Sequence, residues 1–525
     1  MTAHTPRRRR RSVSLAVAAL AVAVLVSGCS TWFVDRSSSG GSERPVAEST
    51  PAAEDVDADL RPFYDQVLSW TDCGGGFQCA EATAPLDWQS PSTSEIKLAL
   101  VKHPASGPGE RLGSLLVNPG GPGGSGYDFV KDSLSFAVSD TLQAQYDVVG
   151  FDPRGVGRSS AISCLTGSEM DSYLYDVLPG ERGSQQWLDA YTASSTQFAA
   201  SCEKNSPELL GHVDTVSAAR DLDLLRATLG DSKLNYLGYS YGTFLGSTYA
   251  DLYPQKVGRL VLDGALDPTS SNFDVSVGQA VGFENAMKAY MADCLTKSSC
   301  PFDGSVDDGM ATIGELLAQV DASPIRAGDG RQLGSSSLLT AIIYPLYDAT
   351  AWDFLSDMFS DVMAGSADYA MQFADGYNGR NPDGTYSDNS TEAFTAINCL
   401  DYQYTNDPAV VQKQNADLVA AAPTIGPWWS YGDISCDVWP DKSTRTPHAV
   451  TAQGAAPIIV VGTTGDPATP YAWAEGLAGQ LSSGQLVTFV GEGHTAYGSS
   501  SCVKGVVDAY FISGTVPASD PRCTS

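Results

Sequence analysis

Short apolar runs recur along the chain and alternate with longer amphipathic stretches. The clearest runs lie at residues 115–118, 146–150, 233–237, 259–262, 457–461 and 486–490. Runs of this length are typical of strands buried on both faces, and strands that alternate with helices form a mostly parallel sheet. The pattern therefore predicts an α/β fold whose functional loops follow the carboxyl ends of the strands.

The sequence Gly-Tyr-Ser-Tyr-Gly at residues 238–242 follows the third run and precedes a helix-like stretch at residues 243–253. A sharp strand-to-helix turn of this kind presents a serine hydroxyl at the edge of a sheet, and the flanking glycines leave room for the turn. Ser240 is therefore the predicted nucleophile. An ordinary loop is the alternative, because Gly-x-Ser-x-Gly also occurs by chance.

An activated serine requires an imidazole base. The chain contains His4, His103, His212, His448 and His494. The first lies in a basic leader, the second precedes a proline at a predicted sheet edge, and the next two lie among polar and turn residues. Only His494 follows a predicted buried strand closely, so we predict that it is the base. A hydrogen-bonded loop histidine is the alternative.

The imidazole needs a carboxylate that fixes its tautomer. Asp466 follows the fifth apolar run and therefore lies at the same predicted edge of the sheet as His494. The order Ser240, Asp466, His494 is the order of the α/β-hydrolase triad. Asp263, at the end of the fourth run, is the alternative acid, and we interpret it as mainly a turn former.

A glycine-rich loop at residues 118–126 follows the first run and offers backbone donors for an oxyanion. Its two prolines have no N–H group, so the usable donors are glycines. We predict that Gly121 acts with the amide of Tyr241, the residue after the nucleophile. Phosphate binding is the alternative, but the loop contains no lysine and no Gly-x-x-x-x-Gly-Lys-Ser/Thr motif.

The chain is longer than one hydrophobic core usually serves. No comparable apolar run lies between the fourth and fifth runs, and helix-like stretches occur there near residues 281–294, 310–320 and 337–359. We therefore predict a first core segment at 60–267, a mostly helical cap at 268–450 and a second core segment at 451–525. A further insertion lies at 160–215.

The N-terminus has the pattern of an export signal. Arginines at 7–11 precede an apolar stretch of 14 residues at 13–26, which is too short to span a membrane. Val-Ser-Gly-Cys at 26–29 resembles a lipobox, so we predict a signal peptide at 1–28 and a lipid anchor at Cys29. A conventional signal peptide is the alternative. The polar residues 29–59 are predicted to form a flexible tether.

Ten cysteines remain when Cys29 is set aside, an even number in a protein predicted to fold outside the cytosol. Sequence alone does not fix their connectivity, but we predict disulfides between sequence neighbours: Cys73–Cys79, Cys164–Cys202, Cys294–Cys300, Cys399–Cys436 and Cys502–Cys523. Zinc binding is the alternative. No Cys-x-x-Cys pair occurs, so we expect no metal.

The formal net charge is −30, and removal of the five arginines of the signal peptide makes it −35. Such a balance repels nucleic acid, so we expect no nucleic-acid partner. The negative charge is interpreted mainly as a source of solubility.

Five motifs, in this order, resemble those of the actinobacterial tripeptidyl aminopeptidases, in the proline-iminopeptidase branch of α/β-hydrolase serine peptidases. They are Asn-Pro-Gly-Gly-Pro-Gly-Gly-Ser-Gly at 118–126, Gly-Phe-Asp-Pro-Arg-Gly-Val-Gly-Arg-Ser at 150–159, the pentapeptide around Ser240, Gly-Asp-Pro-Ala-Thr-Pro at 465–470 and Gly-Glu-Gly-His at 491–494. Proline iminopeptidases proper have His-Gly-Gly-Pro-Gly at the first motif, which favours the tripeptidyl-type relatives. The resemblance implies a serine exopeptidase that releases short units, tripeptides, from free N-termini and requires no cofactor.

An exopeptidase must bind a free α-ammonium group, which a carboxylate can do. Glu284 and Asp401 in the predicted cap are the candidates, with a surface role as the alternative, and Thr469 is expected near the catalytic centre. A carboxylesterase or lipase on the same fold, or a non-catalytic peptide-binding lipoprotein, is the alternative function. The sequence thus predicts an exported enzyme for peptides with free N-termini, either anchored to the outer face of the cell membrane or secreted.

Overall fold

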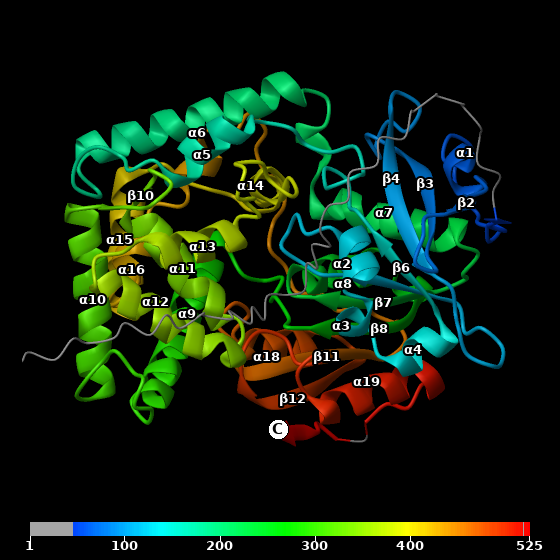
Figure 1. Ribbon diagram of the computed structural model, residues 1–525. Coiled ribbons are helices and arrows are strands. Elements are labelled where there is room, and N and C mark those ends of the chain that lie inside the picture. The colour runs from blue at the N-terminus through cyan, green and yellow to red at the C-terminus, as the bar shows by residue number, and fades with distance from the viewer. Residues whose placement is uncertain (1–45, 518, 525) are drawn as a thin grey trace, which may run out of the picture. The chain divides into compact units, whose positions relative to one another are not determined.

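The computed structural model describes residues 46–517 and 519–524, and its main feature is an eleven-stranded sheet (Figure 1). In spatial order the strands are β1 (Ala47–Glu48), β2 (Ser69–Asp72), β3 (Gln78–Pro85), β4 (Glu95–His103), β6 (Asp147–Phe151), β5 (Ser114–Asn118), β7 (Leu234–Tyr239), β8 (Val257–Asp263), β11 (Ile458–Gly465), β12 (Gly484–Glu492) and β13 (Arg522–Thr524). Pairs from β1 to β6 are antiparallel, and pairs from β6 to β13 are parallel. The predicted α/β class with a mostly parallel sheet is confirmed.

The parallel register aligns the carboxyl ends of the central strands. Gly238 of β7 pairs with Leu262 of β8, and Asp263 of β8 pairs with Val461 of β11. The loops after β7, β8 and β11 therefore leave the sheet at one edge. This is the edge at which ligands bind in open α/β sheets.

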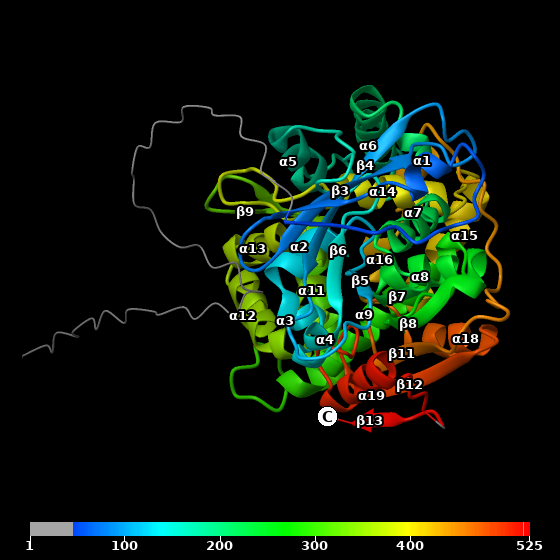
Figure 2. The same ribbon diagram turned by 90° about the vertical axis from the view of Figure 1, so that its right-hand side faces the viewer.

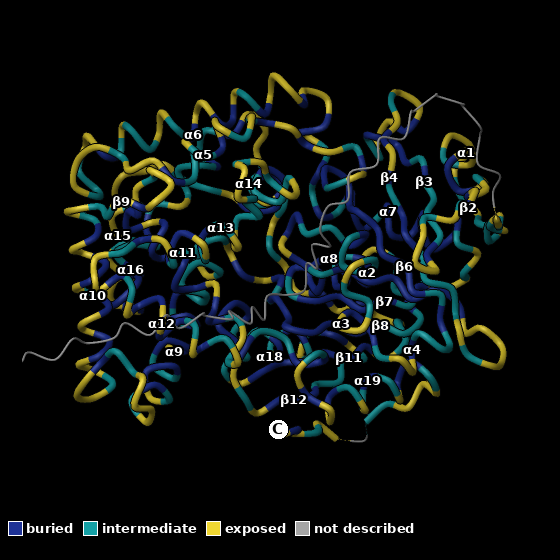
Figure 3. Tube along the Cα trace, in the orientation of Figure 1, coloured by how far each residue is buried: buried dark blue, intermediate teal, exposed yellow. Residues whose placement is uncertain are grey.

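Alternate residues of the central strands pack on opposite faces of the sheet. Leu116, Tyr236, Leu260 and Val460 pack with α1 (Arg61–Tyr64), α7 (Thr215–Thr228), α8 (Tyr241–Leu252) and α18 (Tyr471–Gln480). Val117, Leu237, Val261 and Val461 pack with α2 (Gly126–Asp132), α3 (Leu134–Ala137), α4 (Asp140–Gln145) and α19 (Ser501–Ser513). Figure 2 shows a helical layer on each side of the sheet, and Figure 3 shows the buried central strands.

A mostly helical cap follows β8. Its elements are α9 (Asn272–Cys294), α10 (Val306–Ala322), α11 (Ser335–Leu346), α12 (Trp352–Met363), α13 (Asp368–Tyr377), α14 (Ser390–Asp401), α15 (Pro408–Ala421), α16 (Gly426–Trp429), α17 (Ile434–Asp437) and a short hairpin of β9 (Ile325–Arg326) and β10 (Gln332–Leu333). Apolar residues of α9 to α13, α15 and α16 bury one another in a cluster separate from the two sheet faces. The cap therefore has its own hydrophobic core.

The insertion after β6 packs with the cap. It contains α5 (Gly167–Tyr175) and α6 (Gln185–Asn205), and Tyr175 belongs to the apolar cluster of the cap. The guanidinium group of Arg182 donates hydrogen bonds to the carbonyls of Trp428 at 2.7 Å and Ser430 at 3.1 Å. Two chain segments therefore build the cap. Packing between distant segments leaves no periodic signal in the sequence, so this contact could not be predicted.

Residues 46–59, predicted as part of a flexible tether, are held against the core. β1 pairs with β2, and the N–H of Ala52 donates to the carbonyl of Ala227 at 2.8 Å. The carboxylate of Glu54 pairs with Arg226 at 2.8 Å and also with Lys256. The tether prediction is therefore wrong for this part, since the buried Arg226 requires carboxylate partners. The predicted signal peptide and Cys29 lie outside the described residues.

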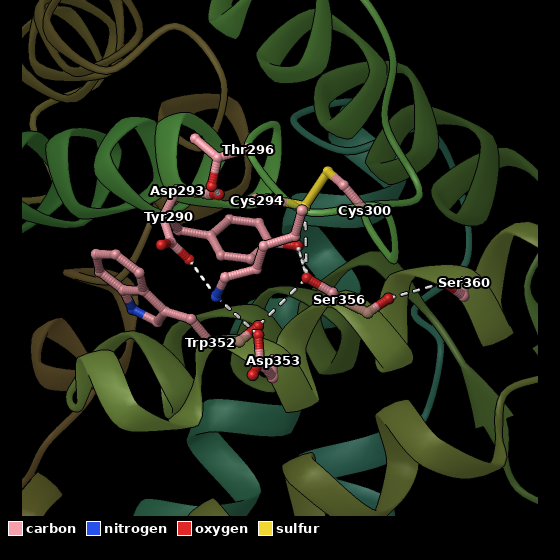
Figure 4. The surroundings of a disulfide bond; sticks show 10 residues. Tyr290, Asp293, Cys294, Thr296, Cys300, Trp352, Asp353, Ser356 and Ser360 are labelled. Atoms are coloured by element: carbon pink, nitrogen blue, oxygen red, sulfur yellow. Dashed lines mark hydrogen bonds and ion pairs between the residues drawn. A yellow bond between two sulfur atoms is a disulfide. The ribbon is translucent and has the colours of Figure 1, made fainter.

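Five disulfides close loops within the described residues. They join Cys73–Cys79, Cys164–Cys202, Cys294–Cys300, Cys399–Cys436 and Cys502–Cys523, which is the predicted pairing of neighbours. The Cys294–Cys300 bridge lies at the end of α9 (Figure 4). Close to it, Lys297 pairs with Asp293 at 2.6 Å and with Asp353 of α12 at 2.8 Å. These contacts fix one end of α9 to α12.

None of the helices in the described part of the chain is long and apolar enough to cross a membrane.

Candidate active site

Ser240 occupies a sharp turn between β7 and α8. Its backbone angles are φ 54° and ψ −126°, a conformation that residues other than glycine rarely adopt and that is concentrated at functional sites. The N–H of Ser240 donates to the carbonyl of Asp263 at 2.9 Å. The turn leaves Ser240 partly exposed, while Tyr239 and Tyr241 on either side of it are buried.

Close packing around this turn requires glycine. A Cβ atom on Gly238 would clash with the carbonyl of Gly242. A Cβ atom on Gly120 would lie 2.6 Å from the carbonyl oxygen of Tyr239 and 2.8 Å from Cβ of Ser240. The glycine-rich loop therefore lies directly against the predicted nucleophile.

Asp466 and His494 lie in the loops after β11 and β12 and are hydrogen-bonded to each other. Nδ1 of His494 donates to Oδ1 of Asp466 at 2.8 Å, and Oδ2 lies at 3.0 Å. The carboxylate also accepts from the N–H groups of Ala468 at 3.0 Å, Thr469 at 2.8 Å and Thr495 at 3.1 Å. The hydroxyl of Thr469 lies 3.3 Å from Nδ1 of His494. These contacts fix the carboxylate and leave Nε2 of the imidazole to face a nucleophile.

Asp263, the alternative acid, connects the loops rather than contacting the imidazole through a hydrogen bond. Its carbonyl binds the N–H of Ser240, and its carboxylate accepts from the N–H groups of Ala496 at 3.0 Å and Tyr497 at 2.8 Å. A Cβ atom on the glycine that follows Asp263 would lie 3.3 Å from Cε1 of His494. Among the described residues no hydrogen bond joins the hydroxyl of Ser240 to His494, a contact that often tightens only when substrate binds.

Two carboxylates act on the charge of His494. Burial lowers the pKa of His494, but the charge and hydrogen bond of Asp466 and the charge of Asp263 raise it, so the pKa lies above its ordinary value of 6.5. Burial also raises the pKa of Asp263 to about 6, although backbone hydrogen bonds favour its charged form. The two acids together stabilise an imidazolium at this position.

The predicted oxyanion donors lie next to the turn of Ser240. The N–H of Gly120 donates to Oδ1 of Asn118 at 3.0 Å and is therefore occupied. In the described part of the chain, neither the N–H of Gly121 nor that of Tyr241 has a hydrogen-bond partner. Both amides are thus available to a developing negative charge on oxygen.

The cap reaches this site at two places. The carbonyl of Tyr347, just after α11, accepts a hydrogen bond of 2.8 Å from the N–H of His494, and the two rings meet edge-on with centroids 5.3 Å apart. At the glycine-rich loop, a Cβ atom on Gly123 would lie 2.9 Å from the carbonyl oxygen of Ser390 in α14. No motif in the sequence marks Tyr347, so the sequence analysis does not find it.

The two predicted cap acids are both buried and both hydrogen-bonded within the protein. Glu284 accepts from the N–H of Thr424 at 3.1 Å and from its hydroxyl at 2.8 Å. Asp401 accepts from the N–H and the hydroxyl of Thr215, and burial raises the pKa of Asp401 to about 7. These contacts favour structural roles for Glu284 and Asp401 over binding of a substrate ammonium group.

Two family models match the chain. A model described as the alpha/beta hydrolase fold matches residues 113–307, which contain the glycine-rich loop and Ser240. A model described as a TAP-like protein matches residues 422–523, which contain Asp466 and His494.

Several curated proteins are similar over most of their length. The chain is 37% identical over 492 residues to serine protease Hip1 of Mycobacterium tuberculosis, covering 88% of this chain and 92% of that protein. It is 36% identical over 505 residues to carboxylesterase B of the same species, covering 92% and 94%. It is 30% identical over 469 residues to tripeptidyl aminopeptidase of Streptomyces lividans, covering 87% and 86%. The crystal structure of a proline iminopeptidase from Mycobacterium smegmatis is similar at 14% identity, covering 82% and 97%, with a TM-score of 0.33.

The sheet order, the turn at Ser240 and the matched models define the class of this protein as an α/β-hydrolase-fold enzyme. Within that class the chain belongs to the family that includes the serine protease Hip1 and the tripeptidyl aminopeptidases. The resemblance drawn from the five sequence motifs is confirmed.

Proposed function

We propose that the protein is an exported serine exopeptidase that releases tripeptides from the free N-termini of peptides. The observation that carries the proposal is the hydrogen-bonded pair of Asp466 and His494 beside the turn of Ser240. The 30% identity to a tripeptidyl aminopeptidase over 87% of the chain supports peptides as substrates and the tripeptide unit.

In the proposed mechanism Ser240 attacks the carbonyl carbon of the scissile bond and His494 takes the serine proton. Asp466 fixes the tautomer of the imidazole and stabilises its charged form. The amides of Gly121 and Tyr241 donate to the oxyanion. His494 then gives the proton to the leaving amine, and water hydrolyses the acyl-enzyme by the same steps in reverse order. These steps require no cofactor.

Mass spectrometry of a long unblocked peptide during digestion tests the proposal. The expected products are free tripeptides and a ladder of peptides shortened by three residues at a time, absent with Ser240→Ala. Losses of one residue at a time would contradict the tripeptide step. Intact peptide alongside rapid ester hydrolysis would contradict the peptidase, and would support the esterase that the 36% identity to carboxylesterase B favours as second candidate.

A lipid anchor at Cys29 is the proposed link to the membrane. Disulfides are typical of proteins that fold outside the reducing cytosol, and the five found here support export. Cell fractionation tests the anchor: the unchanged protein is expected in the membrane fraction and the Cys29→Ser variant in the medium. An equal distribution of the two would contradict a lipid anchor.

A further inference from the structure

A row of three tyrosines in the cap begins at His494 and has no part in the proposed mechanism. The ring of Tyr347 lies 5.3 Å from the imidazole and 6.4 Å from the ring of Tyr377, and Tyr377 lies 6.0 Å from Tyr344, measured between centroids. Tyr344, Tyr347 and Tyr377, here called the tyrosine row, come from α11 and α13 and the residue that follows α11. These two helices pack against each other in the cap (Figure 1).

The tyrosine row carries exposed aromatic surface. Tyr344 is 38% exposed and Tyr377 is 42% exposed, and Tyr347 is partly exposed. Contiguous exposed aromatic surface of this kind marks a binding site.

The chemistry of acyl transfer determines which part of a substrate meets this surface. The acyl part of the substrate is bonded to Ser240, while the leaving amine receives its proton from His494. The leaving segment therefore lies beside the imidazole. The ring of Tyr347 contacts that imidazole, so the tyrosine row begins next to the group that protonates the leaving amine.

We propose that the tyrosine row binds the first residue of the leaving peptide and prefers an apolar or aromatic side chain there. The three rings offer apolar faces and hydroxyl groups but no formal charge, so a charged side chain finds no counterion among them. This inference deepens the proposed function and rests on an acyl-enzyme at Ser240.

Partition of the acyl-enzyme between water and an added amine tests this site directly. The acyl-enzyme is formed on the full-length protein from a tripeptide p-nitrophenyl ester, with phenylalanine amide or glycine amide present. In the transfer, the amine nitrogen bonds to the acyl carbon and the bond from that carbon to Oγ of Ser240 breaks. The amine proton passes through His494 to the serine oxygen. The ratio of amide product to hydrolysed acid reports binding on the leaving side alone.

The wild-type acyl-enzyme is expected to transfer its acyl group to phenylalanine amide about 3 to 10 times more efficiently than to glycine amide. A factor of this size corresponds to the energy that one aromatic pair contributes. Tyr377→Ala is expected to remove this preference and Tyr377→Phe to retain it. Tyr369→Ala is the matched control, because Tyr369 is on the same helix but packs on Phe373 at 4.8 Å. It is expected to retain the preference.

Two results would overturn the inference: no preference in the unchanged protein, or a preference that survives Tyr377→Ala. Failure of the proposed function gives a different result. Without an active nucleophile, no acyl-enzyme forms at Ser240 from the ester. With an esterase, the acyl-enzyme forms but the long unblocked peptide stays intact, and in either case this inference falls. An acyl-enzyme that forms but partitions without preference overturns the tyrosine-row inference alone.

Discussion

The N–H of His494 donates a 2.8 Å hydrogen bond to the carbonyl of Tyr347, so a residue of the cap holds a histidine that the core supplies. Gly493 packs beneath the same carbonyl, at a position where a Cβ atom would lie 3.2 Å from its oxygen. The loop that carries the proposed base is thus shaped by both the sheet and the cap. Catalysis is expected to depend on the position of Tyr347 relative to His494.

Truncation of Tyr347 tests this dependence. Tyr347→Ala is expected to lower kcat for a tripeptide methyl ester about 3- to 10-fold, because an edge-on aromatic pair contributes about 0.5–1.5 kcal/mol. KM is expected to change little, since the small methanol leaving group does not reach the tyrosine row. Tyr347→Phe keeps the ring and is expected to retain kcat. An unchanged kcat in Tyr347→Ala would contradict a positioning role.

The pH profile follows from the raised pKa of His494. The base must be neutral to accept the serine proton, so kcat/KM is expected to rise with pH through an apparent pKa above 6.5. Measurement of kcat/KM with a tripeptide methyl ester from about pH 5 to 9 checks this. The free α-amino group of the substrate, with a pKa of about 7.7–8.0, accounts only for a loss at the alkaline end. A flat profile, or a midpoint well below 6.5, would contradict His494 as the base.

Asparagine substitutions distinguish the two buried acids. Asp466→Asn is expected to lower kcat by roughly 10⁴, because the imidazole then loses the partner that fixes its tautomer. Asp263→Asn weakens the bonds to Ala496 and Tyr497 and is expected to lower the free energy of unfolding by about 1–3 kcal/mol, with a much smaller loss of kcat. Chemical denaturation and steady-state kinetics on both variants check this. The reverse pattern would identify Asp263 as the catalytic acid.

Glu392 gives a prediction about stability. It is 8% exposed in α14, and burial raises its pKa to about 7 from 4.5. The folded state therefore holds this proton more tightly than the unfolded state, and stability is lost as pH rises from 4.5 to 7. Glu392→Gln is expected to raise the free energy of unfolding by about 3 kcal/mol above pH 8 and to leave it unchanged near pH 4. Equal effects at both pH values would contradict the assignment.

The central sheet and its catalytic edge could be predicted from the sequence because both depend on local patterns. Apolar runs define the strands, and in a parallel sheet the residues after them meet at one edge. The order of these runs therefore predicts that Ser240, Asp466 and His494 lie at this edge, without any information on distant contacts. The hydrogen bond between Asp466 and His494 connects two of these predicted loops.

The contributions of distant segments could not be predicted in this way. His103, interpreted as a solvated sheet-edge residue, is only partly exposed in β4, which is paired on both sides, and it packs on Phe77. The antiparallel strands β3 and β4 on this side mix buried and accessible positions, so neither is the uniformly apolar run that is typical of the parallel strands. Tyr347 likewise lies in an unremarkable apolar stretch, and only folding of the cap brings it to His494.

Comparison of a chromogenic tripeptide amide with its N-acetylated form tests the central claim most directly. The full-length protein with its disulfides formed is used, with Ser240→Ala as the control. The account predicts cleavage of the free-amine form alone, and no cleavage of either form by the control. Equal cleavage of both forms would contradict an exopeptidase, and cleavage by Ser240→Ala would contradict the assignment of the nucleophile.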